Sequence, residues 1–114
     1  MTSDELPTEW LRAVLPLAVL STVADGETYG YLVAQHLKSA GLGTVKGGTL
    51  YPVLNRLEAD GLLVSSWRAG VGGPGRKFFE ITPLGAQTLH RRTVAWHEFT
   101  EQAASLLPEV RSRR

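Results

Sequence analysis

Hydrophobic residues recur at helical spacing in four stretches of the chain, and the sharpest pattern lies near its middle. There, apolar residues stand at positions i, i+3, i+4 and i+7, as in a helix with one buried face. The four residues on this face are Leu50, Val53, Leu54 and Leu57. The pattern predicts a helix over about 50–59 that is capped by Thr49 or Gly48 and ends at Asp60-Gly61. The residues expected on its outer face are Tyr51, Pro52, Asn55, Arg56 and Ala59.

Two further helices are predicted before this one. The first spans about 9–24, ends at Asp25-Gly26, and has a kink at Pro16 unless its regular part begins only near Leu15. Its apolar stripe consists of Trp10, Val14, Leu17 and Leu20 or Ser21. The second spans about 29–40, with Thr28 as its N-cap. Its apolar stripe consists of Tyr29, Leu32, Val33, Leu37 and Ala40.

The pattern changes after residue 61. Residues 62–67 and 77–81 are rich in strand-forming side chains, and the glycine-rich segment 68–76 between them predicts a hairpin with a long tip. A last helix is predicted from Pro83 to about Leu107, with Thr82 as its N-cap. Its apolar stripe, close to a heptad seam, consists of Leu89, Trp96, Phe99, Ala103 and Leu106.

The predicted order is three helices, a hairpin and a long helix. It indicates a mainly α fold with a small β-hairpin, in which residues 1–82 form a winged helix-turn-helix domain. Residues 83–107 form a long C-terminal helix, and residues 108–114 form a flexible tail. The long helix is too apolar on one side to be fully covered by so small a domain.

Composition supports one soluble globular domain of 114 residues, with 43% hydrophobic and 20% charged residues. The absence of cysteine excludes a disulfide scaffold and thiolate metal sites, and it is compatible with a reducing cytosol. The acidic start, Met1–Glu5, argues against a signal peptide, and the longest apolar stretch is too short to cross a bilayer. We therefore expect a cytoplasmic protein that does not bind membranes.

The net charge of +1 hides an uneven distribution. Residues 1–27 carry a net charge of −4, residues 28–90 a net charge of +3, and residues 91–114 a net charge of +2. The basic middle of the chain could form one patch for a polyanion. The alternative is an ordinary solvated surface of mixed charge.

Several short blocks follow one another in a specific order along the chain: 29–31, 48–58, 60–62, 73–79 and 81–82, followed by Gly85. In this combination they resemble the PadR-like transcriptional regulators, and the similarity covers roughly residues 11–107. The resemblance implies a homodimeric winged-helix repressor on a palindromic operator, and it points to the short subfamily whose single C-terminal helix mediates dimerisation. Pro16 departs from the family, as does Phe79, where a tyrosine is common and its hydroxyl could contact phosphate.

In such a fold, the outer face of helix 50–59 enters the major groove of double-stranded DNA. Asn55 is suited to adenine and Arg56 to guanine or phosphate, although Asn55 could also be a solvated residue. Thr49 could contact phosphate or act purely as a cap, and the tyrosines Tyr29 and Tyr51 could pack in the core, contact phosphate, or both. The basic residues expected at phosphates or in the minor groove are Lys46, Arg68, Arg76 and Lys77. For the hairpin cations, the alternative is solvated charge.

The seam of the last helix is the second candidate site. Trp96 and Phe99, with Leu89 and Ala103, could form an aromatic-lined site between subunits, or could simply pack in the interface. The resemblance implies a planar aromatic or drug-like effector that relieves repression.

Other functional classes find little support in the residues. Gly70, Gly72 and Gly75 match the spacing of a dinucleotide-binding loop, but a strand is predicted after them where that motif needs a helix. The histidines His36, His90 and His97 are typical of surface positions. Glu58 and Asp60 are interpreted as helix-end charges and not as an acid–base pair, so we expect no enzyme, cofactor or metal site. The alternative to a DNA-binding regulator is a winged-helix protein–protein interaction module that does not bind DNA.

Overall fold

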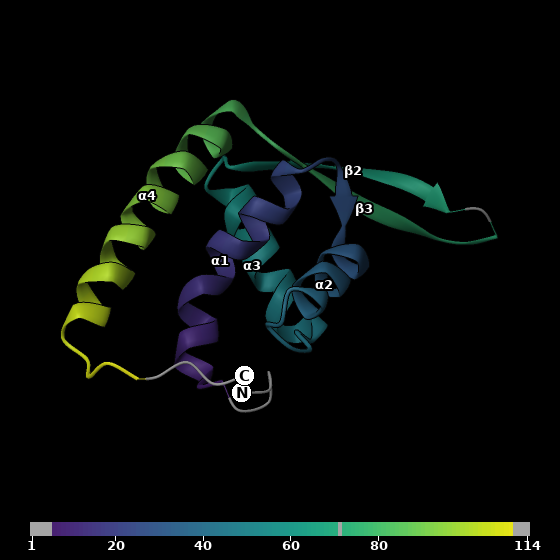
Figure 1. Cartoon of the computed structure of the whole chain (residues 1–114). Coiled ribbons are helices and arrows are strands. Elements are labelled where there is room, and N and C mark those ends of the chain that lie inside the picture. Colours follow the sequence, from purple (N-terminus) through teal and green to yellow (C-terminus); the bar gives the residue numbers. More distant parts are fainter. Residues whose placement is uncertain (1–5, 71, 111–114) are drawn as a thin grey trace.

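The computed structural model describes residues 6–70 and 72–110, so the first five residues and the tail from residue 111 onward lie outside the description. The elements in chain order are α1 (Thr8–Ala24), β1 (Thr28–Tyr29), α2 (Gly30–Ser39), α3 (Gly47–Ala59), β2 (Leu63–Gly70), β3 (Gly73–Ile81) and α4 (Pro83–Ser105). The first three helices gather beneath a small sheet, the hairpin of β2 and β3 projects outward, and α4 follows (Figure 1). The winged helix-turn-helix fold is confirmed.

The core lies where α1, α2 and α3 meet the inner face of the sheet. The apolar stripe predicted on α3 is confirmed, because Leu50, Leu54 and Leu57 are buried and Val53 packs against the same core. The other buried apolar residues are Leu15, Val19, Leu20, Val23, Val33, Leu37, Leu62, Leu63 and Phe79. Phe79, where the family commonly has a tyrosine, is fully buried and packs in this core.

The stripe predicted on α1 is largely wrong. Leu20 is buried as predicted, but Trp10 is 60% exposed, and Leu15, Val19 and Val23 form the rest of the core face. The helix has two apolar faces. The predicted face, with Trp10, Val14 and Leu17, is directed toward α4. The helix runs through Pro16 from Thr8 onward, so a start near Leu15 is excluded.

The helix-turn-helix begins differently from the prediction. Residues Thr28 and Tyr29 form a third strand, not a cap and the first turn of α2. They pair antiparallel with β3, Thr28 opposite Phe79 and Tyr29 opposite Phe78, which gives the strand order β1-β3-β2. Two residues are too few to show the alternation of side chains that predicts a strand. Whether they form a strand therefore depends on hydrogen bonding to β3.

The hairpin strands extend further than their side-chain pattern indicates. Strands β2 and β3 pair from Leu63 opposite Ile81 to Gly70 opposite Gly73, with an irregularity between Arg68 and Gly70. Most of the predicted loop is therefore strand, because backbone pairing continues through glycines that carry no pattern.

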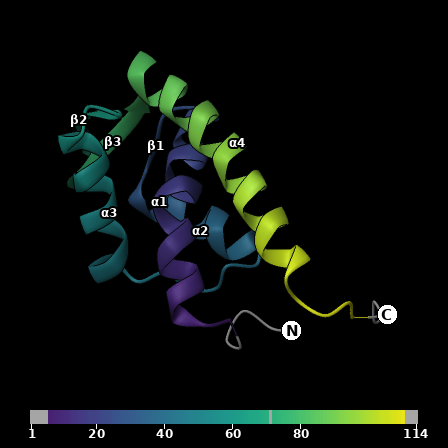
Figure 2. The ribbon, with the colours of Figure 1, turned by 90° about the vertical axis from the view of Figure 1, so that its left-hand side faces the viewer.

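Helix α4 starts as predicted, with Pro83 in its first position and the Gly85 amide donating a hydrogen bond to the Thr82 hydroxyl at 3.0 Å. It ends at Ser105, two residues before the predicted end. Figures 1 and 2 both show α4 running alongside α1. Between residues 6 and 110, leaving out residue 71, the structure contains no helix long and apolar enough to cross a membrane.

Candidate nucleic-acid interface

Helix α3 presents the outer face that the sequence predicts. With Leu50, Leu54 and Leu57 buried, the side chains of Tyr51, Pro52, Asn55, Arg56 and Ala59 are all exposed. The first turn is Gly47-Gly48-Thr49, whose two small residues allow a close approach to the start of the helix. Asn55 lies one turn beyond Tyr51 on this face, where a major groove would meet it.

The predicted start of α3 at about residue 50, with Thr49 or Gly48 as its cap, is wrong. Its first residue is Gly47 and its N-cap is Lys46, whose carbonyl accepts from the Thr49 and Leu50 amides, both at 2.9 Å. Pro52 consequently lies inside the helix instead of in its first turn. The sequence did not predict this start, because glycine has a low intrinsic helix propensity and two glycines stand in the first turn.

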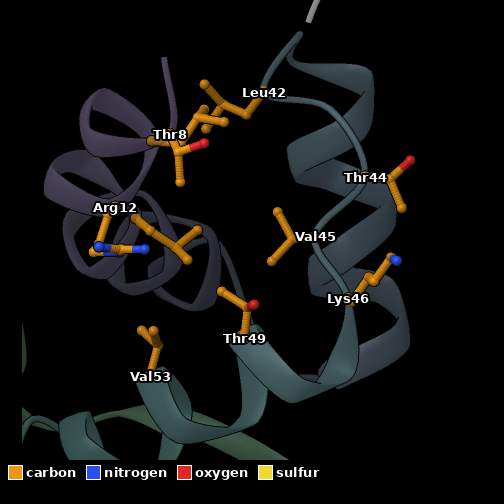
Figure 3. Close-up of a pocket in the computed structure, with 10 residues that line it drawn as sticks. Thr8, Arg12, Leu42, Thr44, Val45, Lys46, Thr49 and Val53 are labelled. Atoms are coloured by element: carbon orange, nitrogen blue, oxygen red, sulfur yellow. The ribbon is translucent and has the colours of Figure 1, made fainter. Parts of the chain in front are cut away.

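Thr49 faces α1 across a pocket of about 320 Å³ at the start of α3 (Figure 3). The labelled residues that line it include Thr8, Arg12, Val45, Lys46 and Val53, and the Lys46 side chain points away from its centre. Thr49 therefore lies on the α1 side of the helix with Val53, away from Asn55. A positioning role fits this place better than base recognition.

Tyr51 of α3 packs against the start of α2. A Cβ atom added at Gly30, the first residue of α2, would lie 2.3 Å from the Tyr51 hydroxyl, so the hydroxyl end of the ring lies directly on the backbone of α2. Tyr51 nevertheless remains 46% exposed. It therefore has a packing role within the helix-turn-helix, and its predicted contact with phosphate stays a prediction.

Arg56 has an acidic neighbour on its own helix. Its Nε atom lies 3.3 Å from Asp60 Oδ1, and both side chains are largely exposed. An exposed pair one turn apart contributes only about 0.3–0.5 kcal/mol, so a DNA phosphate or base could displace Asp60 at little cost. The predicted role of Arg56 stays a prediction.

The outer face of the sheet brings together three of the predicted residues. The Arg76 guanidinium lies 4.7 Å from the centre of the Tyr29 ring and donates a hydrogen bond to the Tyr29 hydroxyl at 2.9 Å. Arg68 lies 4.4 Å from the centre of the Phe78 ring and pairs with Glu27. Both arginines are thus held on aromatic rings, with their charged ends at the surface.

Lys77 lies on the other face of the hairpin, where it ties the hairpin to α3. Its Nζ atom is 3.2 Å from Glu58 Oε1, and the Ser65 hydroxyl donates to Glu58 Oε2. The Ser65 hydrogen bond, and after it the Lys77 charge, lowers the pKa of Glu58 below its ordinary value of 4.5. The sequence suggested only a helix-end charge for Glu58, because partners 7 and 19 positions away leave no local signal.

A second site lies between α1 and α4, where a mostly apolar groove has a volume of about 580 Å³. It brings Trp96, Phe99 and Ala103 together with Trp10 and Val14, and the Trp96 and Phe99 ring centres are 6.0 Å apart. Leu89 lies elsewhere, against the core. The sequence missed Trp10 in this role because its stripe was assigned to the core.

The part of the chain that the structure describes contains no group of three or more histidine, aspartate or glutamate side chains that could hold a metal ion. Gly70 lies in β2 and Gly75 in β3, so these glycines belong to a hairpin and do not precede the helix that a dinucleotide-binding loop requires.

Comparisons with known proteins agree with this architecture. The model of the transcriptional regulator PadR-like family matches residues 19–91. Transcriptional regulator Rv3488 of Mycobacterium tuberculosis is 42% identical over 94 residues, which cover 82% of this chain and 86% of that protein. A PadR family regulator from Eggerthella lenta superposes with a TM-score of 0.80 at 32% identity, covering 90% of this chain and 88% of that one. For a PadR-like regulator from Bacillus cereus, the TM-score is 0.77 at 28% identity, over 90% of this chain and all of that one.

The family match spans more than half of the chain, and the relatives align over most of their length. Regulators of this kind are non-enzymatic and act by binding DNA, which is the role that the exposed face of α3 and the cations around it can serve. The chain belongs to the PadR-like family of transcriptional regulators.

Proposed function

We propose that the protein is a homodimeric repressor that binds a palindromic operator and leaves it when a planar aromatic effector binds. The observation that carries the proposal is the exposed face of α3. This face exposes Asn55, and the glycines in the first turn of α3 leave room for DNA to approach the start of the helix. On the sheet, Arg68 and Arg76, with Tyr29, provide cations for the flanking phosphates. We expect such a regulator to work in the cytoplasm, together with the DNA that it binds.

The unpaired apolar surface of α4 supports dimerisation. Phe99 is 59% exposed, Val94 is exposed on the same helix, and Leu106 and Leu107 are exposed directly after its end. Large apolar side chains left in solvent at this end of the chain favour an interaction site, and a two-fold dimer would bring the same residues from both copies together. Two recognition helices would then reach successive major grooves, with half-sites roughly 34 Å apart.

The groove between α1 and α4 supports the effector. It is lined by aromatic and aliphatic side chains and lies beside the surface that the second copy would cover. A planar molecule that prefers one arrangement of α4 and α1 would change the spacing of the two DNA-binding heads. This coupling is what relief of repression requires.

DNA recognition is tested by gel shift of the full chain on the region upstream of its own gene, over a salt series. We expect steep salt dependence with sequence preference. Asn55→Ala should reduce the preference for specific over random DNA, since a bidentate pair to adenine provides about 1–3 kcal/mol of discrimination. The matched control is Gln87→Ala, which removes an exposed amide from α4. Absence of any binding at low salt would refute the proposal.

The effector is tested by titrating the tryptophan fluorescence of the dimer with a planar cationic dye. We expect quenching that Trp96→Ala abolishes, together with release of DNA at saturating dye. Fluorescence that is unchanged in a confirmed dimer would argue against an aromatic-lined site. Sedimentation of the full chain as a monomer at micromolar concentration would contradict dimerisation itself.

A further inference from the structure

Trp67 is the most exposed aromatic side chain among the residues that the structure describes, at 72%. It lies on β2, opposite Lys77 of β3. The hairpin of β2 and β3 projects from the helices (Figure 1). A Cβ atom added at Gly75 would come 3.6 Å from Trp67 Cε3, so the indole lies across the backbone of β3 where that strand has no side chain. Tryptophan normally buries most of its large apolar surface, and one left in solvent marks a contact site.

The direction of Trp67 follows from strand alternation. Side chains two residues apart share a face, so Trp67 lies on the same face as Ser65. Ser65 and the neighbouring Lys77 contact Glu58 of α3, which identifies this face as the one turned toward the recognition helix. Trp67 lies about 7 Å further out along the strand than Ser65, at about 3.3 Å per residue.

The charge of the hairpin selects the partner. Between Leu63 and Phe79 it carries three cations and no acidic residue. Lys77 shares the face of Trp67 and pairs with Glu58, while Arg68 and Arg76 reach the surface from the opposite face. An exposed indole on a hairpin with basic residues on both faces complements a polyanion with an apolar component, and the sugar wall of a DNA groove has both properties. Proteins that reach the minor groove combine basic side chains with apolar residues in this way.

We propose that Trp67 is a DNA-contacting residue that packs against the sugar–phosphate wall of the minor groove next to the groove occupied by α3. This inference rests on the proposed DNA binding and adds an apolar contact to it. The contact buries the indole without neutralising a phosphate. It therefore contributes affinity that does not depend on counterion release, unlike the contacts of the arginines.

The salt dependence of binding separates these two kinds of contact. Binding is measured by gel shift and fluorescence anisotropy of the full chain on a random-sequence duplex, because a contact to the sugar wall needs no particular operator. Trp67→Ala should weaken binding about 10-fold and leave the slope of log K against log salt unchanged. Arg76→Ala should reduce that slope by about 1. Trp67→Phe, which keeps a flat ring, should retain most of the affinity.

The matched control is Val64→Ala on the same strand. Val64 is an exposed apolar residue whose side chain alternates to the opposite face. It lies opposite Glu80, four residues along the strand from Arg68 and its partner Arg76, so its removal should leave binding unchanged. Thermal melts of both variants establish that they fold. Equal losses for Val64→Ala and Trp67→Ala would overturn the assignment of the face.

A direct readout comes from the intact protein labelled with 5-fluorotryptophan. Its fluorine resonances are followed by NMR as duplex is added, and the Trp67 signal is identified by its loss in Trp67→Phe. We expect this signal to shift and broaden on binding. Two results together would overturn this proposal and leave the proposed function intact. They are a Trp67 resonance that does not move although gel shift shows bound DNA, and an affinity of Trp67→Ala equal to that of the wild type. Failure of the wild-type protein to bind any duplex overturns the proposed function and this inference with it.

Discussion

Gly85 brings the start of α4 into close contact with the backbone between α3 and β2. A Cβ atom built there would lie 2.1 Å from the carbonyl oxygen of Leu62 and 2.7 Å from Ile81 Cγ1. A real Cβ keeps at least about 3.0 Å from such atoms, so Gly85→Ala must separate α4 from the start of β2 by about an ångström. The Leu62 atom belongs to the backbone and cannot turn away. Overpacking of this kind costs about 1–3 kcal/mol, and we expect a value at the upper end.

Gly48→Ala is the matched control, because it makes the same change in another helix. A Cβ atom at Gly48 meets no heavy atom within 4 Å among the described residues, and the glycine lies in the first turn of α3. Alanine there reduces the conformational freedom of the unfolded chain and favours the helix by about 0.5 kcal/mol. The two substitutions should therefore shift the free energy of unfolding in opposite directions.

The assay is thermal unfolding followed by circular dichroism at one fixed protein concentration, since the melting temperature of a dimer depends on concentration. At about 4 °C per kcal/mol for a chain of this size, Gly85→Ala should lower Tm by about 10 °C and Gly48→Ala should raise it by about 2 °C. Equal effects of the two variants would refute the reasoning, as would a change below about 0.5 kcal/mol for Gly85→Ala.

Two further predictions concern the core and the tie between α3 and the hairpin. Leu54→Ala removes a fully buried side chain and should lower the free energy of unfolding in urea by about 2–5 kcal/mol. A loss below 1 kcal/mol would contradict the central place of this residue. Ser65→Ala should return the pKa of Glu58 toward 4.5. Because the folded-state pKa of Glu58 is lowered, its contribution to stability is present above pH 4.5 and is lost as the pH falls through the folded value. The Tm difference between wild type and Ser65→Ala should therefore correspond to less than about 1 kcal/mol at pH 7 and shrink near pH 3, and a difference that does not change with pH would contradict this assignment.

Much of this fold can be predicted from local patterns because the helices obey them. The stripe on α3, the Thr82 cap and the glycine after α3 each depend on residues within one or two turns. The predictions fail where a distant segment decides the outcome. Strand β1 exists because Phe78 and Phe79 pair with it, and the burial of α1 is divided between the core and α4.

The candidate site divides in the same way. Exposure of Asn55 follows from the period of the helix that carries it. The partners of the hairpin cations cannot be predicted from a local period. Arg68 pairs with Glu27, which is 41 positions away, and Arg76 donates to Tyr29, which is 47 positions away. Trp67 was assigned to a strand correctly, but its exposure depends on how far the hairpin projects, and local alternation carries no information on that distance.

The pairing of β1 with β3 has a consequence for synthesis of the protein. Thr28 and Phe79 are opposite each other although about fifty residues separate them. Closing so long a segment is entropically costly and makes this sheet a late, non-local step in folding. During translation, the recognition helix leaves the ribosome well before the strand that fixes the start of α2. A nascent chain or fragment ending before Gly73 thus contains every residue of α3 but lacks β3, and the DNA-binding surface is completed only as the second half of the protein is made.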